Sequence, residues 1–449
     1  MIKVLAITTI LFASIQLHAQ PLSQLEERDL LLRFNTHFYP HLLPNSAVTL
    51  THAKCGTPLI LELKTKWPRL SKPISDGDEY YDIYIQSLGG QSVYGWAYQD
   101  AGTLEITTSS CIVIDNNFTE NIYATRGLNG LQVTAAHEFF HAVQFAYYAN
   151  ANASWWQELT ATWMEDIAYD QINDYYQYLP QFFNEPTTSL NRFSGIYHFG
   201  ASVFAHHLHQ IYGIDAIRSV WESLADLEPR NDSLPAINAG LSLGGFKDLL
   251  PRFALWNYLT GDRSGYYEEA RNYPSVPLKT LTPGVSITNS LGHLAYDYIH
   301  INTSTLSSNL HLNFDLDPDA QWNILIAHFR GSRIELTYTD NPQINIPNPS
   351  RFDHIICIPT VTNLSGEQYK YTCTATPSTA SGLAISLVGD LKNYGRVEFA
   401  DFLNFSVGFG AKPTTPTYRV PHDLNGDGTI NLSDFLIFVS HFGESRSTF

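Results

Sequence analysis

The chain has 449 residues and a formal net charge of −17, because 43 acidic side chains outnumber 26 basic ones. This length exceeds what one hydrophobic core supports and predicts two to four domains. Hydrophobic residues make up 44% and charged residues only 15%, a balance that favours a folded protein over a disordered one. The acidic excess repels phosphate backbones, so nucleic acid is not an expected partner.

The first twenty residues, "MIKVLAITTILFASIQLHAQ", predict a secretory signal peptide over residues 1–19. A single Lys precedes an apolar run from Val4 to Leu17, and Ala19 offers a small residue for cleavage before Gln20. The run is short for a bilayer span, and no later stretch is long and apolar enough for one. We therefore expect an exported, soluble protein without a membrane span, destined for the periplasm, the cell surface or the medium.

Four cysteines are present, at Cys55, Cys111, Cys357 and Cys373. An even number in an exported chain favours disulfide bonds, and their spacing favours the pairs Cys55–Cys111 and Cys357–Cys373 among three connectivities. An alternative exists for the first cysteine, since "AKCGTP" resembles the cysteine switch of matrixin proenzymes, in which a thiolate occupies the catalytic zinc. Residues 20–54, which precede it, are a candidate propeptide.

Strand patterns fill the stretch from residue 80 to 115, in "YYDIYIQSLGG", "SVYGWAYQ" and "TLEITTSSCIVID". Tyr81, Ile83 and Ile85 alternate as in a half-buried strand. From residue 130 to about 260 the apolar period is helical instead. A strand layer followed by helices is typical of an α+β enzyme domain.

The stretch "TAAHEFFHAVQFAYY" contains two histidines four residues apart. On a helix, His137 and His141 lie on one face, one turn apart, and can bind one metal ion. Glu138 sits beside them, near enough to polarise a water at the metal without being a ligand. Zinc lowers the pKa of such a water towards ~7, and a carboxylate can take its proton. Because the motif also arises by chance, a third ligand is needed to identify it as a metal site.

A third ligand is offered by "SWWQELTATWMEDIAYD", a second helical stretch downstream. Glu158 is our choice, because two histidines and a glutamate form the ligand set of thermolysin-type enzymes. Glu165, one heptad further on, is either a hydrogen-bond partner of a ligand imidazole or the ligand itself. Asp166 is a further alternative. The segment after the second histidine, "AVQFAYY", lacks the metzincin extension.

Four segments together, "VTAAHEFFHAVQFAYY", "WWQELTATWMED", "YHFGASVFAHHL" and "ALWNYLTG", resemble the secreted myxobacterial metalloproteases of the MXAN_6640 type, within the gluzincin group. The resemblance covers about residues 80 to 270. Gluzincins carry their third ligand in a W-x-x-E-x-x-A segment, which Trp155, Glu158 and Ala161 match, although Leu159 stands where Gly is expected. The resemblance implies a zincin fold, Glu138 as general base, and three zinc ligands: His137, His141 and Glu158.

Thermolysin-like enzymes stabilise the developing oxyanion with a Tyr or His from a later helix. "SGIYHFGASVF" offers Tyr197 and His198 as catalytic residues for this role, and we favour Tyr197. The relatives carry Tyr where this chain has Phe199, so this assignment does not follow their pattern.

Two other motifs are weaker. Ser242 lies in "GLSLG", the pattern of a serine-hydrolase elbow, but the preceding "DSLPAIN" is not the buried strand that an elbow needs. His206, His207 and His209 cannot share one helical face, because neighbouring residues diverge by about 100°. We expect these histidines to be solvated or packed.

A Pro-rich break at 273–284 separates the helices from alternating segments such as "NLHLNFDL" and "SRIELTYT", which predict a β-sandwich module. The last segment then repeats itself at an offset of 33 residues, from Asp390 and again from Asp423. The second copy places oxygen ligands at the spacing of a calcium loop, at Asp423, Asn425, Asp427, Thr429, Asn431 and Asp434, with Gly428 at the turn.

With Asp at its twelfth position and a twofold repeat, this tail resembles a type I dockerin, a small α-helical module. The resemblance implies a cohesin-like scaffold as partner. In the first copy Lys392 and Tyr394 replace two ligands, so we expect one calcium ion rather than two. A calcium-stapled tail without a partner is the alternative, and in either case we expect calcium removal to unfold only this tail.

We therefore predict a secreted zinc endopeptidase that acts on protein or peptide substrates. Glu138 would deprotonate the attacking water and pass the proton to the leaving amine. The rival is a non-catalytic extracellular binding protein with a structural zinc site and a docking tail. The expected fold is multidomain, and its parts are a signal peptide (1–19), an N-terminal segment (20–54), an α+β zincin domain (55–275), an all-β sandwich (284–375) and a dockerin-like tail (385–449).

Overall fold

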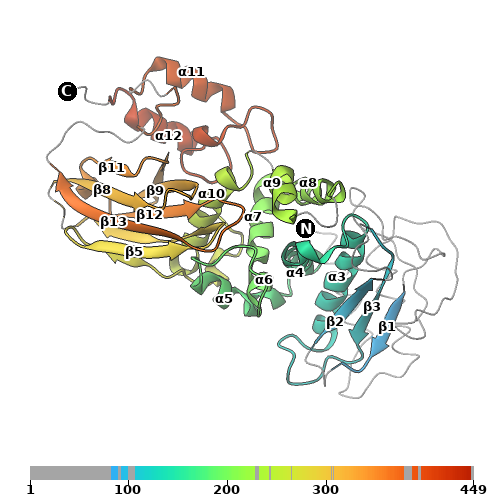
Figure 1. Ribbon diagram of the computed structural model, residues 1–449. Coiled ribbons are helices and arrows are strands. Elements are labelled where there is room, and N and C mark those ends of the chain that lie inside the picture. Colours follow the sequence, from blue (N-terminus) through green and yellow to red (C-terminus); the bar gives the residue numbers. More distant parts are fainter. Residues whose placement is uncertain are drawn as a thin grey trace. The chain divides into compact units, whose positions relative to one another are not determined.

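The structure is a computed structural model (Figure 1). It describes residues 82–88, 93–99, 107–227, 232–241, 244–263, 265–304, 306, 308–378, 387–392 and 396–445. The predictions for the signal peptide, the candidate propeptide, Cys55 and Ser242 lie outside these residues. The chain divides into two compact units, Met1–Gln177 with Trp221–Ala236, and Tyr178–Val220 with Ile237–Phe449. The segment expected to form one domain, 55–275, is therefore shared between them.

The first unit contains a small mixed sheet in the order β1-β3-β2. Its strands are β1 (Ile83–Gln86), β2 (Gly95–Gln99) and β3 (Ser110–Asp115). β3 pairs in parallel with β1 and antiparallel with β2. Every residue of the central strand is buried, as its apolar "CIVI" core requires. Cys111, within it, is disulfide-bonded.

One long helix, α3 (Gly127–Phe145), lies beside this sheet, and a second, α4 (Ser154–Ala168), packs against α3. α3 contacts β2, β3 and α4 (Figure 1). α4 is buried over most of its surface: Trp155, Trp156 and Trp163 pack inside the unit, and polar side chains such as Gln157 and Glu165 are buried with them. The short 3₁₀ turns η2 (Ala151–Ala153) and η3 (Asp174–Gln177) flank α4.

The second unit begins with helices: α5 (Leu179–Asn184), α6 (Tyr197–Gly200), α7 (Ser202–Tyr212) and α10 (Phe246–Tyr258). Two further helices, α8 (Ile214–Ala225) and α9 (Ser233–Gly240), are divided between the units. The turns η4 (Gly261–Arg263) and η5 (Ala270–Asn272) follow α10. α10 contacts α7 on one side and strands of the following sandwich on the other. No helix among the described residues is long and apolar enough to cross a membrane.

A β-sandwich follows, as predicted, in which two sheets lie face to face around one apolar core (Figure 1). One sheet has the order β10-β9-β12-β7-β4, with β6 paired to β12, and the other has the order β11-β8-β13-β5. Leu310, Leu312 and Phe314 alternate into the core, as the sequence pattern predicted. The strands are β4 (Lys279–Leu281), β5 (Ser286–Leu291), β6 (Ala295–Tyr296), β7 (Ile299–Asn302), β8 (Asn309–Leu316), β9 (Trp322–Arg330), β10 (Arg333–Thr339), β11 (Gln343–Ile346), β12 (His354–Val361) and β13 (Tyr369–Ser378).

The predicted Cys357–Cys373 disulfide is wrong, because both thiols are free and buried. Cys357 lies on β12 and Cys373 on β13, so they come from opposite sheets and fill the core as small apolar side chains. Burial raises the pKa of the Cys373 thiol to about 12, so it stays protonated.

The C-terminal tail consists of two helices related by the sequence repeat, α11 (Phe399–Gly408) and α12 (Leu432–His441). Each begins with a capping box, in which the side chain three residues into the helix accepts a hydrogen bond from the backbone of the capping residue. Val397, Phe405, Ile430 and Phe438 form the core between the two copies. A short turn, η7 (Val420–His422), leads into the second copy.

Candidate metal centres

α3 and α4 bring His137, His141 and Glu158 together as one group that could hold a metal ion. Their ligand atoms lie within 4.8 Å of one another. Glu158 Oε2 is 3.2 Å from His137 Nε2 and 3.6 Å from His141 Nε2. The two histidines share a face of α3 because they are one turn apart, and α4 packs Glu158 against that face. The Glu158 side chain is 24% exposed, so this side of the group is open to solvent.

The other ring nitrogen of each histidine is held by a buried partner. His137 Nδ1 is 2.7 Å from Glu165 Oε1, and His141 Nδ1 is 2.7 Å from Gln144 Oε1. Because both partners accept through oxygen, each Nδ1 is the donor of its pair, and Nε2, which faces Glu158, is the nitrogen that a metal ion would take. Glu165 thus occupies the partner position, one of the two that the sequence left open. Asp166 is not in the metal-binding group.

Gln144 is a site residue that sequence reasoning missed. Its side chain is fully buried, and its amide nitrogen donates to the Gln157 carbonyl (2.9 Å) and to Thr160 Oγ1 (3.0 Å) on α4. One side chain therefore orients His141 and ties the two helices together. The sequence did contain a signal for this role: Gln144 follows His141 by three residues and so lies on the same face of a largely apolar helix.

Burial and neighbouring charges shift the pKa values of the side chains in this group. Burial alone would raise the pKa of Glu158, but the neighbouring His141 and His137 hold it well below its usual range. Burial alone would lower the pKa of His137, yet its hydrogen bonds to Glu158 and Glu165 raise it. Burial raises the pKa of Glu165 to about 7 despite the contact with His137. The group thus combines cation-attracting carboxylates with nitrogen donors.

Glu138 is buried between α3 and the sheet, and it accepts a hydrogen bond from the Ala97 backbone on β2. Burial raises its pKa, a shift suited to a group that takes and returns a proton. β2 approaches this closely because Gly95 has no side chain. A Cβ there would lie 3.0 Å from Glu138 Cγ and 2.8 Å from Thr134 Cγ2.

The residues proposed for the oxyanion lie on α6, in the second unit. Tyr197 is buried, and its hydroxyl donates to the Thr188 carbonyl at 3.2 Å within that unit. Its ring packs against Phe182, and burial raises the pKa of the hydroxyl well above its usual value. His198 packs between aromatic side chains of the same region. The assignment of either residue to catalysis stays a prediction.

The histidines of α7 are packed, as expected. His207 is fully buried against Trp256 and Phe253, and burial lowers its pKa. Burial also lowers the pKa of His206, to about 3. Neither belongs to a group of described residues that could hold a metal ion.

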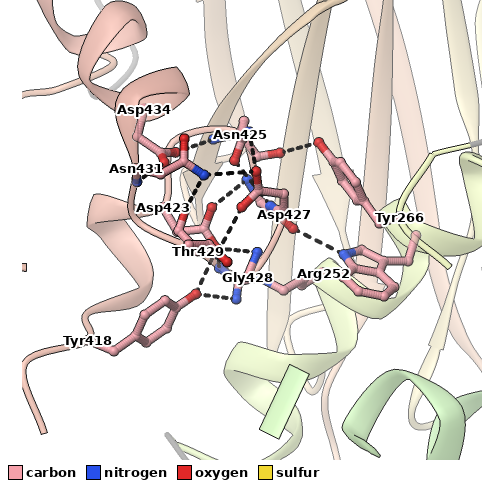
Figure 2. A network of polar contacts seen from close by, with 12 residues as sticks. Arg252, Tyr266, Tyr418, Asp423, Asn425, Asp427, Gly428, Thr429, Asn431 and Asp434 are labelled. Atoms are coloured by element: carbon pink, nitrogen blue, oxygen red, sulfur yellow. Dashed lines mark hydrogen bonds and ion pairs between the residues drawn. The ribbon is translucent and has the colours of Figure 1, made fainter. Parts of the chain in front are cut away.

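A second such group lies in the C-terminal tail, at Asp423, Asp427 and Asp434 (Figure 2). Backbone amides fold the loop around the carboxylates. Asp423 accepts from Gly426 and Gly428, both at 2.9 Å, and these glycines have the positive φ angles that the turn demands. Burial, followed by the charge of Asp423, raises the pKa of Asp434 to about 7. Such crowding of acids favours a bound cation.

Asn425, Thr429 and Asn431 lie in the same loop as these three aspartates (Figure 2). In the first copy of the repeat, Asp401 accepts from the Lys392 backbone at 2.8 Å, and the described residues there form no metal-binding group. The expectation of one ion rather than two stays a prediction.

No protein-family model and no curated protein matches the sequence. Among solved structures, the pre-peptidase C-terminal domain of a collagenase from Bacillus anthracis is 10% identical, covering 22% of this chain and 95% of that one at a TM-score of 0.17. An interface mutant of a type II cohesin–X-dockerin complex from Acetivibrio cellulolyticus is 16% identical, covering 31% and 99% at a TM-score of 0.15. At these TM-scores neither likeness indicates a fold or a function for this chain.

Proposed function

We propose that this protein is a secreted zinc-dependent endopeptidase. The observation that carries the proposal is the group of His137, His141 and Glu158, in which both Nδ1 atoms are held by other side chains and both Nε2 atoms face the Glu158 carboxylate. Two imidazoles and one carboxylate are the ligand set of catalytic rather than structural zinc, because three protein ligands leave a fourth position for water or substrate. Zinc bound there would supply a Lewis acid.

The remaining chemistry belongs to Glu138. Its carboxylate is next to both histidines, buried, and fixed by the β2 backbone. It would take the proton of the attacking water and return it to the leaving amine. Glu165 and Gln144 act as positioning residues, since each holds a ligand imidazole in one orientation.

The test is cleavage of a diverse peptide library by the secreted full chain, read by mass spectrometry. Glu138→Gln should keep its zinc but lose at least about 100-fold in kcat/KM. The matched control is Glu222→Gln, which makes the same change at an exposed site on α8 and should leave cleavage unchanged. A folded, zinc-loaded wild-type protein without cuts would favour the rival, a binding protein with a structural zinc site.

We also propose that the loop from Asp423 to Asp434 binds one calcium ion and that the tail docks a cohesin-like scaffold. The three clustered carboxylates support the first statement. Large apolar side chains exposed on both helices support the second. Phe399 and Leu403 on α11 correspond in the repeat to Leu432 and Leu436 on α12, and each helix also exposes a valine, Val407 and Val439. Surface plasmon resonance of the full chain on an immobilised cohesin module tests it. Binding should require calcium and should fall with Leu436→Asp.

A further inference from the structure

The outer side of the candidate calcium loop is bonded to the rest of the second unit (Figure 2). Three consecutive carbonyls receive donors from three different places. The Leu424 oxygen accepts from the Leu336 amide at 3.2 Å, the Asn425 oxygen from the Tyr266 hydroxyl at 2.8 Å, and the Gly426 oxygen from the Trp256 indole at 3.0 Å. A loop that only bound an ion would have no need of these contacts.

The first of these bonds caps an exposed edge. β10 is the last strand of its sheet, so amides on its outer side have no neighbouring strand. Leu336 is on β10, and its amide is used by the tail instead. The fit is close, because a Cβ on Gly426 would lie 2.7 Å from Leu336 Cδ1.

The same strand also holds α12. Arg333 donates to the carbonyls of Leu436 (3.5 Å) and Ile437 (3.3 Å), in the middle of the helix. His441 Nε2 lies 3.0 Å from Glu335 Oε2. Loop and helix of the second repeat are therefore both attached to β10.

α10 adds a buried charge to this contact. Arg252 is 1% exposed, and its Nη2 is 3.0 Å from Asp423 Oδ2. That oxygen also accepts from the Tyr418 hydroxyl and the Gly428 amide, whereas among the described residues Oδ1 accepts only from the Gly426 amide. Oδ1 therefore has the capacity left for an ion. One guanidinium beside three aspartates leaves two negative charges, which a divalent cation would neutralise.

We propose that this loop is a calcium-dependent clasp that fastens the tail to its own chain, on the surface formed by α10, Tyr266 and β10. The proposal rests on the proposed calcium binding. In a calcium loop the side chains at positions 1, 3 and 5 bind the ion, so a bound ion would fix the backbone from Asp423 to Asp427. The ion thereby fixes the same carbonyls that Leu336, Tyr266 and Trp256 bind. Without it, carboxylate repulsion opens the loop and those three bonds weaken together.

The clasp differs from a stapled, independent tail in what calcium removal does to the sandwich. The contact between the tail and the sandwich also contains two cavities of about 630 and 420 Å³, lined by residues of both. Because this contact is not closely packed throughout, the hydrogen bonds from Leu336, Tyr266 and Trp256 contribute much of what holds the tail in place. Loosening the loop should be felt on β10, outside the tail.

Hydrogen exchange of the full chain, with saturating calcium and with chelator, tests this difference. We expect chelation to speed exchange at the Leu336 amide by at least tenfold, while Ile356 in the central strand β12 changes little. Faster exchange confined to the loop, with Leu336 unchanged, overturns the clasp and leaves calcium binding intact. An absence of calcium binding by titration calorimetry overturns both.

Thermodynamic linkage supplies a second measurement. If bound calcium strengthens the contact between the loop and the rest of the unit, that contact must strengthen calcium binding by the same factor. The double variant Trp256→Phe/Tyr266→Phe removes two donors outside the ion's ligand set. We expect it to bind calcium at least about fivefold more weakly. Tyr369→Phe, which removes a hydroxyl bonded to Ser365 elsewhere on the sandwich, is the control and should bind as the wild type does. Equal affinity of the double variant and the control overturns the proposal.

Discussion

Glu165 offers a sharp test of how the histidine–glutamate group is held. Its carboxylate accepts from His137 Nδ1 at 2.7 Å, and its side chain is only 7% exposed. A buried hydrogen bond to a charged group contributes about 1.5–3 kcal/mol. Substitution of such partners typically costs ~10–100-fold in metal affinity, or ~1.4–2.7 kcal/mol. The two ranges agree, so Glu165→Ala should weaken zinc binding by about 10–100-fold.

Glu165→Gln separates the two contributions of the carboxylate. The amide keeps an oxygen acceptor for His137 Nδ1 but lacks the negative charge, so its loss of affinity should lie between wild type and Glu165→Ala. Zinc affinity is measured by competition with a chromogenic chelator, and circular dichroism confirms folding. The exposed Glu222→Gln serves again as control. If Glu165→Ala held zinc within twofold of the wild type, the orienting role of this carboxylate would be refuted.

Three further predictions follow from buried contacts. Arg252→Met leaves Asp423 buried without its ion-pair partner, so the calcium-free protein should lose about 3–5 kcal/mol in denaturant unfolding, and saturating calcium should reduce that loss. The pKa of His441 is raised because its contacts with Glu335 and Glu444 outweigh the effect of burial. The protonated imidazole should therefore stabilise the folded protein fully below about pH 6.5, and this stabilisation should fall as the pH rises through the raised pKa. Unfolding midpoints measured against pH should show this slope for the wild type but not for His441→Gln. Gly95→Ala should push β2 away from α3 and reduce kcat more than zinc content, measured by activity and metal analysis together.

The sequence predicted the local parts of this protein well, since each depends on a short period. Two histidines one turn apart share a helix face in any context, and the loop spacing from Asp423 to Asp434 brings its carboxylates together by itself. The alternation of Leu310, Leu312 and Phe314 likewise determined which side chains enter the sandwich core.

Other features depend on which elements pack together, and the sequence did not contain that information in a local form. Gln144 contacts His141 locally within α3, but the orientation of its amide also depends on Gln157 and Thr160, which only the packing of α4 supplies. The Cys357–Cys373 prediction failed because closeness in the chain does not specify orientation across two sheets.

The C-terminal tail shows the same division most clearly. Its repeat, its helices and its candidate calcium ligands were all determined by the sequence of one short segment. That Tyr266, Trp256 and Leu336 bind the carbonyls of the loop was decided by the tertiary structure alone. The physical reason is that backbone carbonyls are the same in every sequence, so only the packed fold determines which donors reach them.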